Sequence, residues 1–385
     1  MRPRVLVTRR LPEPALERLA AGCEVEVNPA DRPMSRDEIM NRVRGAAALL
    51  SLLTDRVDEK LMDAAGPGLK VVANYAVGFD NVDVASATAR RIAVTNTPDV
   101  LTETTADLAL ALMLDASRRV SEGDRLVRRG GFRGWAPMLM TGHDVHGATL
   151  GLYGFGRIGR AVAARAAGFR MRVIYHDEAR ADAATEGRLA ARFVSFDELL
   201  RESDVISIHC PLTPATRHRF ALKEFSAMKR TARIVNTARG PVIKEDDLAE
   251  ALRRGLIAGA GLDVYEAEPA VDPGLPPLDS VVLAPHLGSA TVATREGMAM
   301  IAAECVLDAL AGRRPAACVN PEVYGDAEPG ASARDGRDLA GPAPKGRGPG
   351  GQGPGGQEAG GPAPKGRGLA GREPGGSEPG GKAGH

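Results

Sequence analysis

The chain has 385 residues, which is enough for two domains with well-buried cores. Its 50 Lys and Arg residues balance 49 Asp and Glu residues, so the net charge of +1 favours neither nucleic acid nor a membrane surface as a partner. No apolar run approaches the roughly 18 residues that cross a bilayer, and the N-terminal segment lacks the apolar core of a signal peptide.

Short β-branched runs alternate with helical patterns through the first hundred or so residues. The pattern around 35–44 opens with Ser35 and has Glu38 three residues later, which is the spacing of a capping box at a helix start. This alternation is typical of βαβ units with a parallel sheet. Strands are predicted at 4–8, 23–28, 46–51, 69–76 and 92–98, and helices at 12–21, 35–44 and 57–66.

A second alternating set follows, beginning near residue 149. Between the two sets, the apolar spacing over 102–130 predicts one long amphipathic helix that joins two α/β units. Another helix pattern, 291–310, comes after the second set and is expected to return to the first. We therefore predict two doubly wound parallel-sheet domains with a cleft between them. The second set has predicted strands at 149–154, 171–177, 204–210, 233–238, 257–264 and 281–285.

The composition changes near the C-terminus. Glycine and proline dominate residues 326–385, and the octapeptide GPAPKGRG occurs at 341–348 and again at 361–368. Such a segment cannot bury enough apolar surface to offset the entropy lost on ordering. We predict a disordered, weakly basic tail over 323–385, acting as a solvated extension or as a docking peptide.

The segment GFGRIG contains Gly154, Gly156 and Gly159 in a G-x-G-x-x-G pattern, directly after a predicted strand and opening a predicted helix. In this setting the glycines permit a tight turn, a close approach of the backbone to a pyrophosphate, and packing of the helix on the strand. Asp177 ends the next strand, 18 residues beyond Gly159, where a carboxylate accepts hydrogen bonds from a ribose. The pattern predicts a dinucleotide site.

The choice between NAD and NADP rests on the residues after that strand. Asp177 and Glu178 repel a 2′-phosphate, whereas Arg180 could contact one. The two carboxylates favour NAD, with NADP possible.

Three polar residues follow later strands, at the sheet edge where ligands gather in doubly wound folds. Arg239 follows the strand at 233–238, Glu268 follows the strand at 257–264, and His286 follows the strand at 281–285. An arginine, a carboxylate and a histidine at one sheet edge can bind an acid and move a proton.

These features resemble the D-isomer-specific 2-hydroxyacid dehydrogenase family over about residues 1–322. The shared motifs, all in the family's order, are VGFDNVD, ETTADLALALML, GFGRIG, NTARG, LDVYEAEP and PHLGSAT. The segments at 51–59 and 134–151 are most similar to the glyoxylate and hydroxypyruvate reductase branch. The resemblance implies a flavodoxin-like substrate domain of residues 1–98 plus 288–322 and a Rossmann NAD(P)-binding domain of residues 99–287.

The resemblance also implies roles for single residues. Arg239 would bind the substrate carboxylate, His286 would exchange a proton with the 2-keto oxygen, and Glu268 would hydrogen-bond to His286. Around them, the implied substrate-binding residues are Val77, Gly78, Leu53 and Ser289, together with Arg239 and His286. The implied cofactor-binding residues are Gly154, Gly156, Arg157, Ile158, Gly159, Asp177, Cys210, Thr237, Ala238, Asp263 and Thr105.

The implied activity is reduction of glyoxylate or hydroxypyruvate to the D-2-hydroxy acid. Two alternatives stay open: a phosphoglycerate dehydrogenase, and a non-enzymatic, NAD-sensing binding protein similar to the C-terminal-binding corepressors. A homodimer is expected from the family, through the nucleotide-binding domain and the 102–129 helix. Trp135 lies on a loop that can reach a partner's substrate site in related reductases, and a plain packing role is the alternative.

Cysteine usage bears on the compartment and on metals. Cys23, Cys210, Cys305 and Cys318 are scattered, with no C-x-x-C spacing. This usage is typical of free thiols in a reducing compartment, so we expect a cytoplasmic protein with no bound metal. The balanced charge leads us to expect no nucleic-acid partner.

Overall fold

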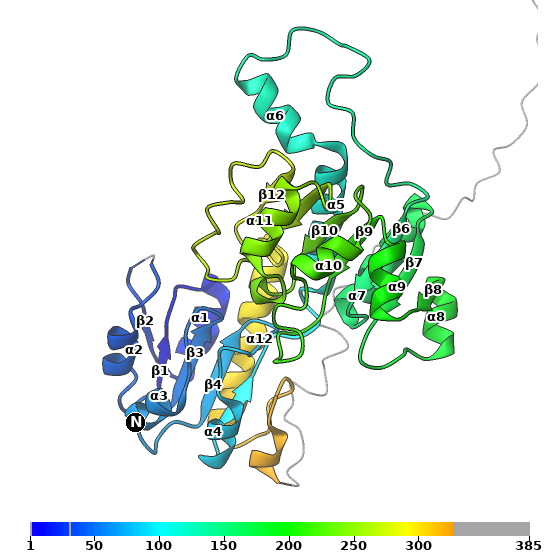
Figure 1. Cartoon of the computed structure of the whole chain (residues 1–385). Coiled ribbons are helices and arrows are strands. Elements are labelled where there is room, and N and C mark those ends of the chain that lie inside the picture. Colours follow the sequence, from blue (N-terminus) through cyan, green and yellow to red (C-terminus); the bar gives the residue numbers. More distant parts are fainter. Residues whose placement is uncertain (1, 31, 326–385) are drawn as a thin grey trace, which may run out of the picture. The chain divides into compact units, whose positions relative to one another are not determined.

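The computed structural model describes residues 2–30 and 32–325, which form two parallel sheets (Figure 1). The first sheet has the strand order β2-β1-β3-β4-β5, which is flavodoxin-like. Its elements in chain order are β1 (Arg4–Val7), α1 (Glu13–Ala20), β2 (Glu24–Val27), α2 (Arg36–Arg42), β3 (Ala48–Leu52), α3 (Glu59–Ala65), β4 (Val71–Tyr75), α4 (Val84–Ala89) and β5 (Ala93–Thr95).

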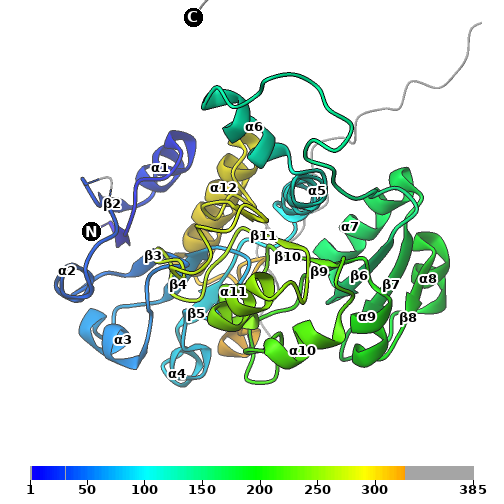
Figure 2. The same ribbon diagram turned by 45° about the horizontal axis from the view of Figure 1, so that its top comes forward.

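The second sheet has the order β12-β11-β10-β9-β6-β7-β8, and Figure 2 shows α7 and α9 on opposite sides of it. Its strands are β6 (Thr149–Tyr153), β7 (Arg172–His176), β8 (Ala191–Phe193), β9 (Val205–Ile208), β10 (Arg233–Asn236), β11 (Gly259–Leu262) and β12 (Val281–Leu283). Its helices are α5 (Thr102–Arg118), α6 (Val120–Arg128), α7 (Arg157–Ala166), α8 (Ala183–Leu189), α9 (Phe196–Glu202), α10 (Leu222–Ala227) and α11 (Glu245–Arg253), with the short 3₁₀ helices η1 (Ala167–Phe169) and η2 (Gly240–Val242).

Helices cover both faces of each sheet, as strands that are apolar on both sides require. In the first sheet, Leu50 and Ala73 join the core formed with α1 and α12 (Val292–Leu310), whereas Leu49 and Val72 join the opposite core. The helix predicted over 291–310 does return to the first sheet, where it packs against α1 and β4. The predicted fold class of two doubly wound parallel-sheet domains is confirmed.

The single helix predicted over 102–130 is wrong, because the chain breaks it at Arg119. Arg119 adopts a left-handed conformation with φ of 58°, which ends α5 and precedes α6. The Asp115 carboxylate accepts hydrogen bonds from the backbone N–H and the hydroxyl of Ser121, which ties the start of α6 back to α5. The first turn of α5 contacts α12 through Thr104 and Thr294, at 2.7 Å, and the rest of α5 packs against α7, β10 and β11. Helix α6 buries none of its residues.

The capping box predicted at Ser35 and Glu38 is confirmed at the start of α2. At the other end of the described chain, η3 (Pro321–Tyr324) lies against the first core through Val323 and Tyr324. The packed part of the chain therefore includes residues 323 and 324, although we expected the tail to begin at residue 323. The rest of the predicted tail, 326–385, lies outside the described residues.

The predicted domain limits (1–98 plus 288–322, and 99–287) and the predicted cleft stay predictions. Among the described residues, no helix is long and apolar enough to cross a membrane.

Candidate active site

The glycine loop lies between β6 and α7, at the point where the second sheet reverses its strand order. Strand β6 has β7 on one side and β9 on the other, so the loops after β6 and β9 diverge here and leave a crevice for a ligand. Gly154 has φ of 98°, and a Cβ on it would lie 2.6 Å from the backbone nitrogen of Cys210, which follows β9. Only glycine fits there.

The start of α7 is suited to a phosphate. Gly156 is its N-cap residue, so no side chain caps the first turn, and a Cβ on Gly156 would meet open space. Arg157, Ile158 and Gly159 form that turn, whose N–H groups and helix dipole attract an anion. A Cβ on Gly159 would lie 2.3 Å from the carbonyl oxygen of Gly154, so glycine brings the helix close to the loop.

Asp177 lies directly beside this loop. Its carboxylate accepts hydrogen bonds from the backbone N–H of Phe155 at 2.6 Å and from that of Glu178 at 2.7 Å. Arg180 is held by both carboxylate oxygens of Glu186, at 2.9 and 2.8 Å. The carboxylate of Asp177 therefore lies against the glycine loop, whereas Arg180 is paired with Glu186 and does not contact that loop.

Two buried polar atoms near this crevice have no partner. Among the described residues, the hydroxyl of Thr237 and Nδ1 of His209 are buried without a hydrogen bond. Such orphaned groups are rare in native interiors and are commonly satisfied by a ligand or a water. His209 and Cys210 both lie against Gly154 of the glycine loop, and burial raises the pKa of the Cys210 thiol to about 12, so it stays neutral. These residues fit a dinucleotide.

Arg239 is carried by the tight turn that follows β10. Asn236 folds this turn, because its buried side chain donates to the carbonyl of Arg239 at 2.9 Å and accepts from the N–H of Ala238 at 3.0 Å. The guanidinium donates through Nε to Asp80 at 3.0 Å and through Nη1 to the carbonyl of Ala238 at 2.9 Å. Neither residue was predicted from the sequence. Only the folded chain brings Asp80 to Arg239, whereas Asn236 bonds within its own turn and an Asx-turn pattern over 236–239 is the signal that could have indicated it.

The guanidinium of Arg239 also lies against Gly78. A Cβ on Gly78 would come within 1.8 Å of Nη2, so a side chain at this position would displace the arginine. The structure thus places Arg239 beside the predicted backbone cradle of Val77 and Gly78. A permanent cation beside backbone N–H groups is suited to a carboxylate.

Glu268 and His286 form a hydrogen-bonded pair. Nδ1 of His286 lies 2.9 Å from Oε2 of Glu268, whose other oxygen accepts from the N–H of Tyr265 at 3.1 Å. Burial raises the pKa of Glu268, but the hydrogen bond and charge of His286, aided by the charge of Arg239, outweigh burial and leave it below its usual value. Glu268 therefore stays ionised beside His286.

The backbone around His286 is held by Asp263. This carboxylate is buried and accepts from the N–H groups of Leu287 at 2.6 Å and Gly288 at 2.8 Å. His286 itself is left-handed, with φ of 57°, a conformation that costs of the order of 1–3 kcal/mol and persists only where its surroundings impose it. The hydroxyl of Thr105 donates to the carbonyl of Gly288 at 3.0 Å, so Thr105 supports the same segment.

Three other predicted residues lie on loops or at a helix start. Leu53 is in the turn after β3, and Ser289 follows Gly288 and accepts through its carbonyl from Nε of Arg295 at 3.2 Å. The exposed side chain of Arg157 pairs with Asp99 at 2.7 Å. Only the backbone N–H of Arg157 therefore belongs to the proposed phosphate site at the start of α7.

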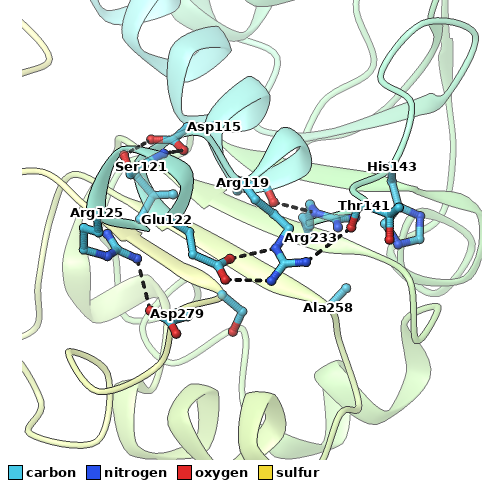
Figure 3. A pocket seen from close by; sticks show the side chains of 13 residues that line it. Asp115, Arg119, Ser121, Glu122, Arg125, Thr141, His143, Arg233, Ala258 and Asp279 are labelled. Atoms are coloured by element: carbon cyan, nitrogen blue, oxygen red, sulfur yellow. Dashed lines mark hydrogen bonds and ion pairs between the residues drawn. The ribbon is translucent and has the colours of Figure 1, made fainter. Parts of the chain in front are cut away.

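A pocket of about 350 Å³ lies elsewhere, at the base of α6 (Figure 3). Its charged side chains engage groups of the chain itself: Arg119 is bidentate to Glu122, Arg125 pairs with Asp279, and Nε of the buried Arg233 donates to the carbonyl of Ala116. None of the predicted site residues lines it. Among the described residues, no group of three or more metal-binding side chains could hold a metal ion.

A dinucleotide-type glycine loop, an arginine and a carboxylate–histidine pair are the features expected of a nicotinamide-dependent oxidoreductase. The model of the D-isomer-specific 2-hydroxyacid dehydrogenase NAD-binding domain matches residues 110–288. Glyoxylate reductases of Korarchaeum cryptofilum and Thermococcus onnurineus are 49% and 46% identical over 332 and 334 residues, which is 86% of this chain and 99% of theirs. The chain therefore belongs to the D-isomer-specific 2-hydroxyacid dehydrogenase family, and it is an NAD(P)-dependent oxidoreductase.

A solved structure agrees with this assignment. The NADPH-dependent glyoxylate/hydroxypyruvate reductase of Sinorhizobium meliloti, in complex with NADP and malonate, is 32% identical and superimposes with a TM-score of 0.73. The match covers 83% of this chain and 98% of that one.

The Glu268–His286 pair predicts a loss of turnover in Glu268→Gln. An amide in place of the carboxylate removes the charge-assisted hydrogen bond at Nδ1 of His286 that fixes the orientation of the ring. The kcat for 2-keto acid reduction, measured by NADH oxidation, should then fall at least about tenfold, because a positioned proton donor contributes about a hundredfold or more to the rate.

Glu266→Gln is the matched control, because Glu266 lies on the same loop and pairs with a different histidine, His218, at 2.6 Å. Its kcat should match that of the unaltered chain. An equal kcat for Glu268→Gln and the unaltered chain would contradict the proton-donor pair.

Proposed function

We propose that this chain reduces glyoxylate or hydroxypyruvate to the D-2-hydroxy acid. The observation that carries the proposal is the position of Arg239 against Gly78, together with the hydrogen bond of His286 to Glu268 at 2.9 Å. This arrangement offers a cation for a small carboxylate and a proton donor for the adjacent keto group. The glyoxylate reductases at 46–49% identity support the substrate class.

The substrate carboxylate is bound by the guanidinium of Arg239 and the backbone N–H groups of Val77 and Gly78. Asp80 holds Nε of the guanidinium, so Nη2 faces the cradle beside Gly78. The planar, permanently charged fork of arginine suits a carboxylate next to a polarised carbonyl oxygen.

His286 supplies the proton to the 2-keto oxygen, and takes one back in the reverse direction. Because Glu268 engages Nδ1, Nε2 is the nitrogen that delivers the proton. Asp263 fixes the backbone that carries the ring. When bound, the nicotinamide cofactor supplies the hydride.

The cofactor is held by the glycine loop and the strand ends around it. The first turn of α7 binds the pyrophosphate, and Asp177 binds the adenosine ribose. NAD is the proposed choice, because Asp177 and Glu178 carry like charges to a 2′-phosphate and Glu186 engages Arg180. The remaining contacts are assigned to Cys210, Thr237, Ala238, Asp263 and Thr105.

The proposed partner is a second copy of this chain, bound through α6 and the segment that follows it, 129–142. This surface carries large apolar side chains that are strongly exposed. The exposed fractions are 60% for Val120, 60% for Val127, 53% for Phe132, 83% for Trp135 and 80% for Met138. Contiguous apolar surface of this kind marks an interaction site.

The proposed compartment is the cytoplasm, because the four cysteines are free thiols in the structure. The expectation that no nucleic acid binds stays a prediction.

The substrate proposal predicts turnover with small 2-keto acids. The full chain should oxidise NADH with glyoxylate or hydroxypyruvate in a spectrophotometric panel that also includes 3-phosphohydroxypyruvate, the substrate of the phosphoglycerate dehydrogenase alternative. As a control, His286→Ala should lose at least about a hundredfold in kcat while retaining NADH fluorescence on binding. A chain that reduces none of the non-phosphorylated acids would refute the proposal.

The cofactor proposal predicts the effect of a charge change at Asp177. Asp177→Asn keeps an acceptor for the N–H of Phe155 but removes the charge that repels a 2′-phosphate. The ratio of kcat/KM for NADH to that for NADPH should fall about tenfold, the equivalent of about 1.4 kcal/mol. Glu178→Gln, a similar change at the exposed neighbour, should alter the ratio far less. If Asp177→Asn leaves the ratio unchanged, Asp177 does not read the ribose.

A further inference from the structure

Two loops of the first sheet carry the predicted substrate contacts. Leu53 lies in the turn after β3, and Val77 and Gly78 lie in the loop after β4. Strands β3 and β4 are paired neighbours, with Ser51 opposite Asn74. The two loops therefore leave the sheet side by side, and their relative position has to be fixed by contacts beyond the strand pairing.

Asn74, in β4, is fully buried and uses its whole amide. Its Nδ2 donates to the carbonyl of Gly78 at 2.9 Å and to Oδ1 of Asn81 at 3.0 Å. Its Oδ1 lies within hydrogen-bond distance of Oγ of Ser51, at 3.2 Å, and of Nδ2 of Asn81, at 3.1 Å. Asn74 thus holds the loop after β4 at Gly78, the residue against which Arg239 lies.

Asn81 crosses from the loop after β4 to the turn after β3. Its Nδ2 donates to the carbonyl of Leu52 at 3.0 Å and to that of Asp55 at 2.9 Å. Its own carbonyl accepts from the N–H of Val57 at 2.9 Å. One side chain therefore links the two substrate-facing loops, and it does so directly next to Asp80, which orients Arg239.

The side chain of Asp55 stabilises the turn after β3 through hydrogen bonds on its buried side. Its buried carboxylate accepts from the N–H of Leu52 at 2.8 Å and from the hydroxyl of Thr8 at 2.5 Å. Burial raises the pKa of Asp55, and these hydrogen bonds oppose that effect. The turn that carries Leu53 is thus held by Thr8 and Asp55 on one side and by Asn81 on the other.

The hydrogen bonds of Asn81 require an amide at position 81. The carbonyl of Asp55 needs a donor and Nδ2 of Asn74 needs an acceptor, and a single primary amide supplies both. The carbonyl of Leu52 takes its second hydrogen bond from the same amide, beside the one from the N–H of Asp55 at 3.0 Å. A carboxylate at position 81 would face two carbonyl oxygens, and an alanine would remove the donor to the carbonyl of Asp55. Either change leaves a partly buried polar group unpaired and so weakens the link between the two loops.

We propose that Asn81, together with Asn74, is a positioning residue for substrate binding. The amide pair fixes the backbone N–H groups of Val77 and Gly78 relative to Leu53, and it anchors Asp80 so that Arg239 faces the same cradle. The inference rests on the proposed reduction of a small 2-keto acid. Neither asparagine touches the reacting atoms; both act through the loops that they join.

Asn81→Asp and Asn81→Ala test the inference in the full chain. Since the cradle binds the carboxylate in the ground state and the transition state alike, KM for glyoxylate or hydroxypyruvate should rise about tenfold or more, with kcat changed by less than about threefold. The dissociation constant of NADH should stay unchanged. Thr8→Val, a milder change that removes one hydrogen bond to Asp55, should raise KM about threefold.

Asn320→Ala is the matched control for a loss of stability. Asn320 is buried and satisfies the N–H of Val94, the carbonyl of Ile92 and the hydroxyl of Thr88, but it contacts neither substrate-facing loop. It should lower Tm as much as Asn81→Ala does while leaving KM unchanged.

The outcomes separate the inference from the function on which it rests. If the unaltered chain reduces no 2-keto acid, the proposed function fails. If it does so and Asn81→Asp and Thr8→Val both keep the original KM, the positioning role is wrong. A rise in KM for Asn320→Ala equal to that for Asn81→Ala would also overturn it, because the effect would then follow stability alone.

Discussion

The guanidinium of Arg239 lies against the backbone of Gly78, and the carboxylate of Asp80 holds it there at 3.0 Å. The arginine comes from the turn after β10 and the glycine from the loop after β4, so this contact joins the two sheets where the substrate carboxylate is proposed to bind. It requires glycine at position 78, an acid at position 80 and the sharp turn that Asn236 folds. Each of these three features is local in the sequence, and the contact between Arg239 and Gly78 explains why each is needed.

The proton-donor side of the site is built in the same way, by buried acceptors that fix backbone. Asp263 accepts two N–H groups after His286 and thereby supports a left-handed histidine, while Glu268 engages its ring. On the opposite side, Asn74 and Asn81 fix the loops of the first sheet. In both places buried polar side chains hold loop backbone, so that the charged groups meet a substrate in a preset arrangement.

Much of this could be predicted from the sequence, since the signals are local. The βαβ periodicity gave both sheets, and the strand–glycine–helix order indicated the dinucleotide loop. Apolar periodicity failed at Arg119, because it does not report that the side chain of Asp115 caps the backbone of Ser121. Asp80 and Asn81 were missed for a related reason: their partners depend on strand pairing and on the meeting of distant turns. Asn236 was missed although its partners, Ala238 and Arg239, are local.

A structure of the full chain with NADH and oxamate, a 2-keto acid mimic that is not readily reduced, tests the central claim most directly. The account predicts that the oxamate carboxylate accepts from the guanidinium of Arg239 and from the N–H of Gly78, with its amide-bearing carbonyl oxygen facing Nε2 of His286. A carboxylate bound away from Gly78, with Arg239 still paired only to Asp80, would contradict the account.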